Sequence, residues 1–315
     1  MISMRYHIFS IVAVFLALAV GVVLGSTSLS GTLLSGLSNQ RDDLATQVAD
    51  LQAERSNLQA RLADADGFAG AVGPKVVSGL LAERTVMVVS TEGVAQSERD
   101  GVKRLIQAAG GSVSGEVTLT DAFTDQAKAE RMSDVAIRLQ PAGAKFPTSG
   151  TPGALAGALL GQTLLLDGKT AQPQTSAGER AAAIAGLAEG GFIQASNDIQ
   201  PAQLAVVLVG DRAQGTGAGD EAVTLAQFAT QLDKEGAGTV LAGRPSTAEG
   251  SGAIGAVRAD SAASQVLSTV DNVDSQAGQV TTVLALREQL EDGVGSYGIA
   301  GNADAVAPGA EAPSG

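Results

Sequence analysis

The sequence has no cysteine, no tryptophan and a single histidine, His7, among its 315 residues. Without cysteine the chain forms no disulfide, so its stability must come from an ordinary packed core. Because His7 lies so near the N-terminus, the rest of the chain offers neither Ser-His-Asp nor Cys-His catalysis and no zinc site built from histidine or cysteine. We therefore expect a non-enzymatic protein with no catalytic residue, no metal site and no cofactor.

Positive charge and aromatic residues are also scarce. Asp and Glu number 33 against 20 Lys and Arg, which gives a net charge of −13, and aromatic residues make up 3% of the chain. A domain this acidic repels nucleic acid and anionic lipid headgroups, so nucleic acid is not an expected partner. A membrane β-barrel requires many alternating segments of about 10 residues and aromatic girdles. The sequence shows neither.

Residues 8–25 form an unbroken apolar run of 18 residues. As a helix this run is about 27 Å long, which is close to the hydrocarbon thickness of a bilayer. Arg5 precedes it and the next Lys or Arg is Arg41, a bias that predicts a cytoplasmic segment 1–7, a span 8–28 and an extracytoplasmic remainder. A cleaved signal peptide is the alternative, but its apolar core is usually shorter and followed by a small-x-small site. We predict a single-pass anchor in the plasma membrane.

Small residues recur at every fourth position of this span, at Ala13, Ala17, Gly21 and Gly25. Such a ladder lets two membrane helices approach closely, and Gly21-x-x-x-Gly25 is a typical pairing motif. The alternative is that alanine and glycine are simply common in membrane helices. We predict that this ladder pairs two copies of the chain.

A heptad pattern follows over residues 33–66, with Leu37, Leu44, Leu51 and Leu58 at d positions. Leu at d with Val or a polar residue at a is typical of a parallel two-stranded coiled coil, and polar a residues fix its register. Arg41 and Arg55 occupy a positions, where their stems can pack while their charges reach g residues. The alternative is a helix that packs on its own globular domain. With the ladder, the predicted homodimer interface comprises Ala13, Ala17, Gly21, Gly25, Leu37, Leu44, Val48, Leu51, Leu58 and Leu62.

After a predicted hinge at 67–79, strands alternate with amphipathic helices over 80–299. Apolar, β-branched runs at 85–90, 112–119, 204–210, 239–242 and 279–286 predict strands, and 96–109, 221–234 and 260–270 predict helices. Strand–helix–strand units indicate an α/β domain with a largely parallel sheet. The low-complexity residues 300–315 are predicted to be disordered.

Two features of this domain invite a chemical interpretation. The glycine-rich residues 210–219 follow a strand and precede a helix, as a phosphate cradle would, but they lack the GK[ST] ending and the regular G-x-G-x-x-G spacing, so we predict a flexible loop. Asp271 and Asp274 lie three residues apart and could bind a hard cation or act as an acid/base pair. Aspartates that cap a local turn are the alternative, which we favour because no companion motif accompanies them.

Several segments resemble the MctB family of actinobacteria: residues 1–26, the leucine heptads, 238–244, 268–274, 282–286 and 295–298. The likeness extends to about residue 301. It implies a role in copper efflux and resistance, with an outer-membrane channel as the proposed mechanism. A corynebacterial relative, SteB, implies instead the separation of daughter cells, together with a membrane partner and a peptidoglycan hydrolase.

The residues favour a scaffold over a pore. A pore needs a barrel or several spanning helices, and this chain offers one. Copper prefers thiolate, thioether or imidazole ligands, yet only Met87 and Met132 lie beyond the apolar run. We therefore expect a dimeric coiled-coil scaffold that partners itself and another membrane or envelope protein, with copper implied by the resemblance alone. A SteB-like regulator of cell separation is the alternative.

Overall fold

The computed structural model describes residues 4–147, 150–211, 213–215 and 217–310, and for 26–38 it describes the backbone alone. The chain divides into two compact units, residues 1–64 and 65–315. Helix α1 (Met4–Val76) supplies nearly all of the first unit and the beginning of the second. Its residues Met4–Gly25 form the one helix in the described chain that is long and apolar enough to cross a membrane. This confirms the predicted N-terminal apolar helix.

The second unit is built on a seven-stranded sheet. Its order is β3-β2-β1-β4-β5-β6-β7, and every neighbouring pair is parallel except β2 and β3. The largely parallel α/β fold predicted from the sequence is therefore confirmed. The strands are β1 (Thr85–Thr91), β2 (Ser112–Leu119), β3 (Ile193–Ala195), β4 (Leu204–Val209), β5 (Thr239–Gly243), β6 (Ser268–Val270) and β7 (Ser296–Tyr297).

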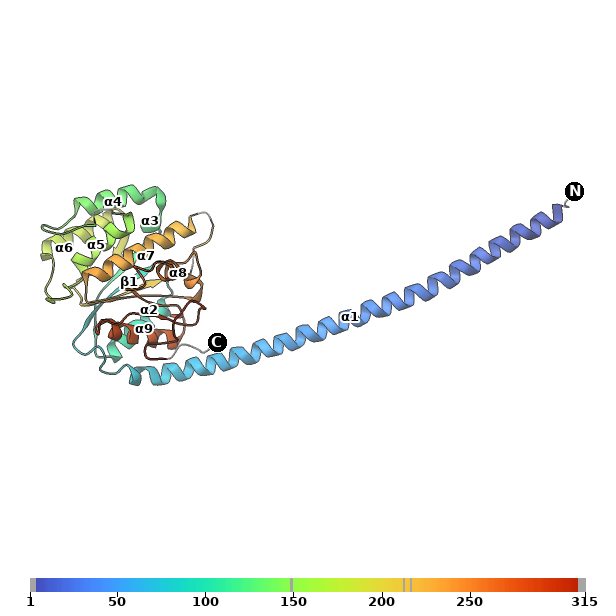
Figure 1. Cartoon of the computed structure of the whole chain (residues 1–315), viewed down its shortest axis with the longest axis horizontal. Coiled ribbons are helices and arrows are strands. Elements are labelled where there is room, and N and C mark those ends of the chain that lie inside the picture. The colour runs from blue at the N-terminus through green and yellow to red at the C-terminus, as the bar shows by residue number, and fades with distance from the viewer. Residues whose placement is uncertain (1–3, 148–149, 212, 216, 311–315) are drawn as a thin grey trace. The chain divides into compact units, whose positions relative to one another are not determined.

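Helices cover both faces of this sheet (Figure 1). Helices α2 and α9 pack on one face, whereas α4, α5, α7 and α8 pack on the other. Successive side chains of β1 point to opposite faces of the sheet. Val86 and Val88 pack on the face that α2 and α9 cover, and Met87 and Val89 pack on the opposite face. The helices are α2 (Gln96–Ala108), α3 (Asp121–Thr124), η1 (Gln126–Lys128), α4 (Ala129–Arg138), α5 (Pro152–Leu164), α6 (Ala177–Glu189), α7 (Ala218–Glu235), η2 (Pro245–Ala248), α8 (Ala253–Ala259) and α9 (Gln276–Gln289).

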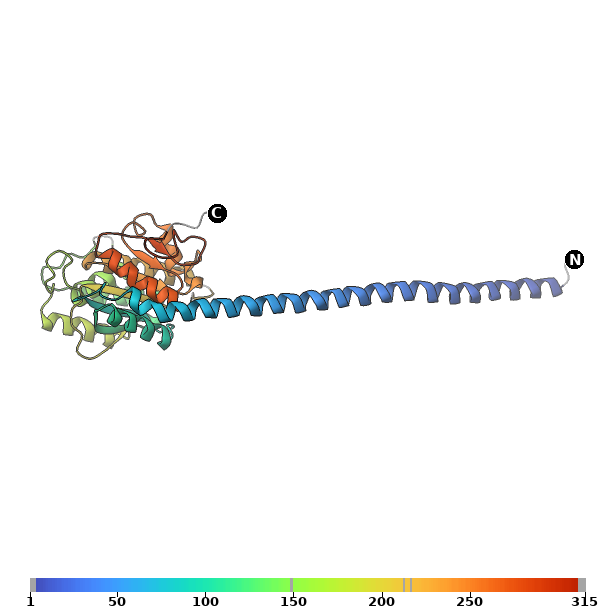
Figure 2. The ribbon, with the colours of Figure 1, turned by 90° about the horizontal axis from the view of Figure 1, so that it is seen from below.

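The predicted hinge at 67–79 is wrong for most of its length, because α1 continues as a helix to Val76. The glycines of this segment serve close packing instead of breaking the helix. A Cβ on Gly73 would come within 2.4 Å of Val280 Cγ2, and one on Gly70 within 3.2 Å of Gln276 Cγ. Both contacts are to α9, which lies beside this part of α1 (Figure 2).

Two other local predictions are also wrong. Residues 279–286 belong to helix α9 instead of a strand, and 260–270 form turns that lead into β6 instead of a helix. Part of the tail predicted to be disordered is held on the domain. Ala305 pairs with Tyr297, and the Asn302 side chain donates to Ala248 O at 2.8 Å. Residues 311–315 lie outside the described chain.

The buried carboxyl of Asp233 in α7 gives a test of this fold. Burial raises its pKa from 3.8 to about 7, although Oδ1 accepts a hydrogen bond from Thr239 N at 2.7 Å. A group whose pKa is raised on folding favours the folded state most below its unfolded pKa. That contribution is lost as pH rises through the folded pKa. The free energy of unfolding should therefore fall between about pH 4 and pH 7.

Asp233→Asn keeps the acceptor oxygen and removes the ionisable group. We expect denaturant titrations to show a smaller loss of unfolding free energy across this pH window, by on the order of 2 kcal/mol relative to the wild type. A variant with the wild-type pH dependence would contradict the assignment.

Candidate functional site

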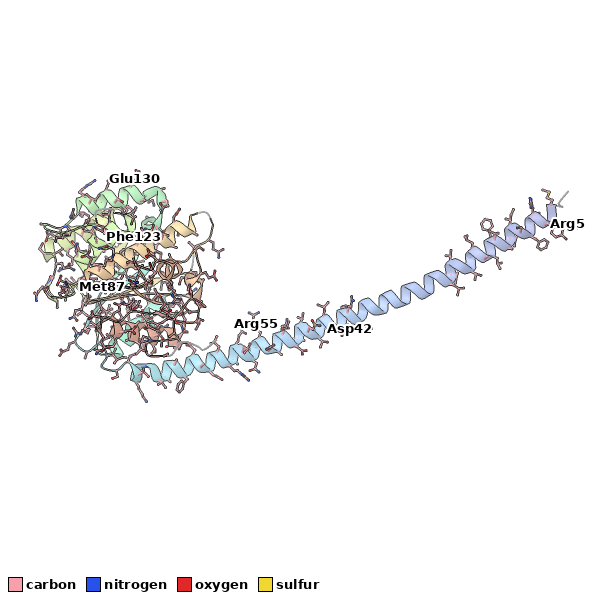
Figure 3. The ribbon with its side chains drawn as sticks, viewed as in Figure 1. Arg5, Asp42, Arg55, Met87, Phe123 and Glu130 are labelled. Carbon is pink, nitrogen blue, oxygen red and sulfur yellow. The ribbon has the colours of Figure 1, made fainter. Side chains whose placement is uncertain are left out.

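The heptad face of α1 carries large apolar side chains that no other part of the described chain covers. Leu44, Val48, Leu51, Leu58 and Leu62 are between 49% and 70% exposed. Three of them, Leu51, Leu58 and Leu62, line a shallow apolar hollow together with the stem of Arg55. Arg55 and Asp42 project from this part of the helix in Figure 3. The side chain of the remaining predicted position, Leu37, lies outside the described residues.

The predicted ladder in the apolar span is equally open. Ala13, Ala17, Gly21 and Gly25 all lie on the exposed helix surface. A Cβ added to Gly21 or Gly25 would meet no atom within 4 Å. Nothing in the chain's own fold explains these small residues, so their pairing stays a prediction.

A second candidate site is a crevice at the carboxyl edge of the sheet. Strands β1 and β4 are neighbours, but the chain leaves β1 toward α2 on one face and β4 toward α7 on the other. Open α/β sheets bind ligands at such a switch in strand order. The cavity here has a volume of about 180 Å³ and is lined from the ends of β1, β2 and β4, the start of α7 and the residues before α8.

Two glycines form the floor of this crevice. A Cβ on Gly210 would lie 2.7 Å from the carbonyl carbon of Gly93, so the backbones that follow β1 and β4 are in contact. Gly210 N also donates to Thr91 Oγ1 at 2.9 Å, which joins the two strand ends. Only glycine fits so close an approach of two backbones. The glycine-rich loop predicted as flexible therefore begins with a fixed contact.

The walls of the crevice are acidic. Asp121, Asp211 and Glu221 line it, and no lysine or arginine does so among the residues that the structure describes. Burial raises the pKa of Glu221, and the neighbouring charges of Asp121 and Asp125 raise it further. Hydrogen-bond donors and cations would be attracted to these carboxylates. In the described chain no group of three or more His, Cys, Asp or Glu side chains is placed to hold a metal ion.

The sequence reading missed these carboxylates, although each has a positional signal. Asp121 begins α3 just beyond β2, Asp211 follows β4 by two residues, and Glu221 lies in the first turn of α7. The carboxyl ends of parallel strands share one edge of a sheet, but only the strand order shows which ends are neighbours.

An ion-pair network adjoins the crevice. Arg244, which follows β5, donates to Glu98 Oε1 at 2.8 Å and to Asp211 Oδ2 at 2.6 Å. Ser246 Oγ also donates to Asp211, at 3.1 Å. Arg244 therefore neutralises part of the negative charge that surrounds Asp211 and joins α2 to the loops after β4 and β5.

The two aspartates singled out in the sequence do not form an acid/base pair. Asp271 is fully buried, and its Oδ2 accepts from Arg258 Nη1 at 2.8 Å while Oδ1 accepts from Ile299 N at 2.8 Å. Asp274 lies at the surface, where partial desolvation and Glu98 raise its pKa and Arg244 lowers it. The structure thus gives Asp271 a structural contact in place of a cation or a substrate.

The two methionines of the domain are likewise structural. Met87 in β1 and Met132 in α4 are both buried in the core, on the face of the sheet where Phe123 meets Phe228 edge-on with ring centroids 5.2 Å apart (Figure 3). Their thioethers pack against apolar side chains, so neither is presented to a soluble metal ion.

Comparison with known proteins gives the family. Residues 1–308 match the family described as "Copper transport outer membrane protein, MctB". The chain belongs to the MctB family. A Mycobacterium tuberculosis protein named Copper transporter MctB is 39% identical over 303 residues, covering 95% of this chain and 96% of the relative. A Mycobacterium leprae protein of the same name is 37% identical over 314 residues, covering 97% and 99%. The match runs through the apolar span, the heptads and the α/β domain of this MctB-family chain alike.

The Arg258–Asp271 pair supplies a prediction for the MctB-family domain. Asp271→Ala would leave a buried guanidinium without its partner carboxylate, which typically costs about 3–5 kcal/mol. We expect a loss of unfolding free energy of that order in denaturant titrations. Asp274→Ala is the matched surface control and should change stability by less than about 0.5 kcal/mol. Equal losses in the two variants would contradict the structural role assigned to Asp271.

Proposed function

We propose that this MctB-family protein is a membrane-anchored, parallel homodimeric scaffold of the cell envelope that serves copper homeostasis and is neither a pore nor an enzyme. One observation carries the proposal. A helix with a single apolar span continues into a face of exposed leucine and valine at heptad spacing. Exposed apolar stripes of this kind are buried in nature by a partner helix.

A second copy is the partner that fits this face best. Two copies anchored by their N-terminal spans in one membrane present their heptads in the same direction, which makes the pairing parallel. In a parallel pair the a and g positions of opposite helices are adjacent. Arg55 at a would then meet Glu54 of the second copy at g, and Arg41 would meet Gln40. The charges of Arg55 and Glu54 on the heptad face therefore favour a parallel dimer.

Several observations support the topology and the absence of a pore. Arg5 lies before the apolar span and the next Lys or Arg is Arg41, which supports a cytoplasmic N-terminus and an extracytoplasmic domain. One spanning helix per copy cannot enclose a channel without the assembly of many copies. We place the anchor in the plasma membrane, although the family's description names the outer membrane.

The copper role is taken from the family, whose curated relatives are named copper transporters. The soft side chains of the α/β domain are buried in its core. We therefore propose that the dimer acts on copper through a protein that it holds, with the acidic crevice as the docking site that the domain offers.

The dimer can be tested by disulfide cross-linking, since the natural chain has no cysteine. Leu44→Cys and Leu58→Cys, both at d positions, should each give covalent dimers in isolated membranes under mild oxidation. Two separated d positions are needed because an antiparallel pair could bring at most one of them against its own copy. Ala53→Cys, at the outward f position, is the control and should stay monomeric. Monomers at all three positions would refute the proposed dimer.

The cellular role can be tested by deletion of the gene followed by complementation. We expect the deletion to raise cellular copper and copper sensitivity, and the wild-type chain to restore both. A chain with Leu44, Leu51 and Leu58 replaced by Asp should fail to restore them, because the stripe can no longer pair. A control with Asp43, Asp50 and Asn57 replaced by Ala, all at outward c positions, should succeed. Normal copper handling with chained, unseparated cells would replace the copper role with the SteB-like regulation of cell separation.

A further inference from the structure

The last turns of α1, residues 65–76, have two distinct sides. One side packs on the α/β domain through Gly70 and Gly73, which lie against Gln276 and Val280 of α9. Asp66 completes this side, because its Oδ1 accepts from Gln276 N at 2.6 Å and from Ala277 N at 3.3 Å. Asp66 therefore caps the N-terminus of α9, where a carboxylate is favoured by the free N–H groups and the helix dipole.

The other side of the same turns is apolar and uncovered. Phe68 is 69% exposed and Val76 is 49% exposed, and Ala65 is exposed between the heptads and Phe68. Ala65 and Val76 continue the d and a positions of the heptad register that includes Leu58 and Leu62, and Phe68 occupies a g position. The domain covers mainly the e and b positions, Asp66, Gly70 and Gly73. The a and d residues between Ala65 and Val76, which are Ala69 and Val72, are half-buried. The seam is therefore partly covered in its middle, and it stays open at Ala65 and Val76 and beside them at Phe68.

We propose that the dimer seam continues past Leu62 into this domain-bound segment, where the same residues of a second copy cover Ala65, Phe68 and Val76. This inference rests on the homodimer proposed above and extends it from the stalk to the domain. The continuing heptad register supports it, and so does the open face beside the e and b positions. It also makes the apolar side chains of this segment part of an interface.

Charge complementarity identifies the second copy as the occupant. In a parallel coiled coil a g residue lies beside the e residue of the next heptad in the opposite helix. Arg61 is such a g residue, and Asp66 is the corresponding e residue. Arg61 is exposed and donates within its own helix to Asn57 Oδ1 at 3.0 Å. A carboxylate can accept hydrogen bonds at both of its oxygens. Asp66 can therefore cap α9 through Oδ1 and receive Arg61 of the second copy at Oδ2.

Cross-linking in the full-length protein tests the extended seam separately from the stalk. We expect Ala65→Cys and Val76→Cys to form disulfide-linked dimers in membranes at rates comparable with Leu58→Cys. Gly67→Cys is the matched control, since it lies at an outward f position where a Cβ meets no atom within 4 Å. It should stay monomeric.

The outcomes separate the two ideas. Cross-linking at residue 58 without cross-linking at 65 and 76 would overturn the extended seam and leave the stalk dimer intact. No cross-linking at any of these positions would overturn both. A photoreactive benzoylphenylalanine at position 68 names the occupant directly: an adduct with a second copy supports the inference, and an adduct with lipid or another protein overturns it.

The proposed ion pair has its own test. Arg61→Gln removes the positive charge, and Asp66→Asn removes the negative charge while keeping an oxygen that can cap α9. Each variant should slow disulfide formation at Ala65→Cys by about twofold, and the double variant should slow it no further, as expected for an exposed pair. Additive effects would show that Arg61 and Asp66 act independently and would overturn the pairing.

Discussion

The large apolar side chains of α1 up to Leu62 are exposed in the part of the chain that the structure describes, and the proposed function depends on how they are covered. In the first 25 residues a lipid bilayer can cover them, because every backbone group of a helix is already hydrogen-bonded internally. In the proposed topology the leucines beyond that span lie outside the hydrocarbon. Their heptad spacing fits a second helix of the same kind.

The α/β domain differs from the stalk because it buries most of its large apolar side chains within its own fold. Two hydrophobic layers, one on each face of a doubly wound sheet, stabilise it without disulfides. The polar groups that stay available gather at the carboxyl edge, where Asp121, Asp211 and Glu221 border the crevice. The domain thus presents a cluster of carboxylates at this edge, beside the close contact of Gly93 and Gly210.

The sequence predicted the parallel α/β domain because strands such as 204–210 are continuous apolar runs with no helical period. The strand predicted at 279–286 was wrong, because Val280, Thr281 and Val283 are β-branched and suggested a strand where α9 lies. Helix α9 packs against the sheet, α2 and the end of α1, so burial on several sides hides the 3.6-residue period that would have revealed it. Ser275, whose side chain accepts from Gly278 N, was the available start signal.

The exposed heptad face of α1 could be predicted because heptads are local in the sequence, and its pairing with a second copy stays a prediction. The crevice was not, because Asp121, Asp211 and Glu221 become neighbours only through the order of the strands. The prediction of a hinge at 67–79 was wrong because glycine permits a bend and a close helix contact alike. Only the presence of Val280 opposite Gly73 decides between the two.

The contacts of Arg258 have a consequence for the end of the chain. Arg258 Nη1 donates to Asn302 Oδ1, and Asp271 Oδ1 accepts from the backbone N–H groups of Ile299 and Ala300. Residues 299–302 therefore supply hydrogen bonds to the charge pair that Arg258 and Asp271 form in the core. A chain that terminated before residue 299 would be expected to leave both charges short of donors and acceptors.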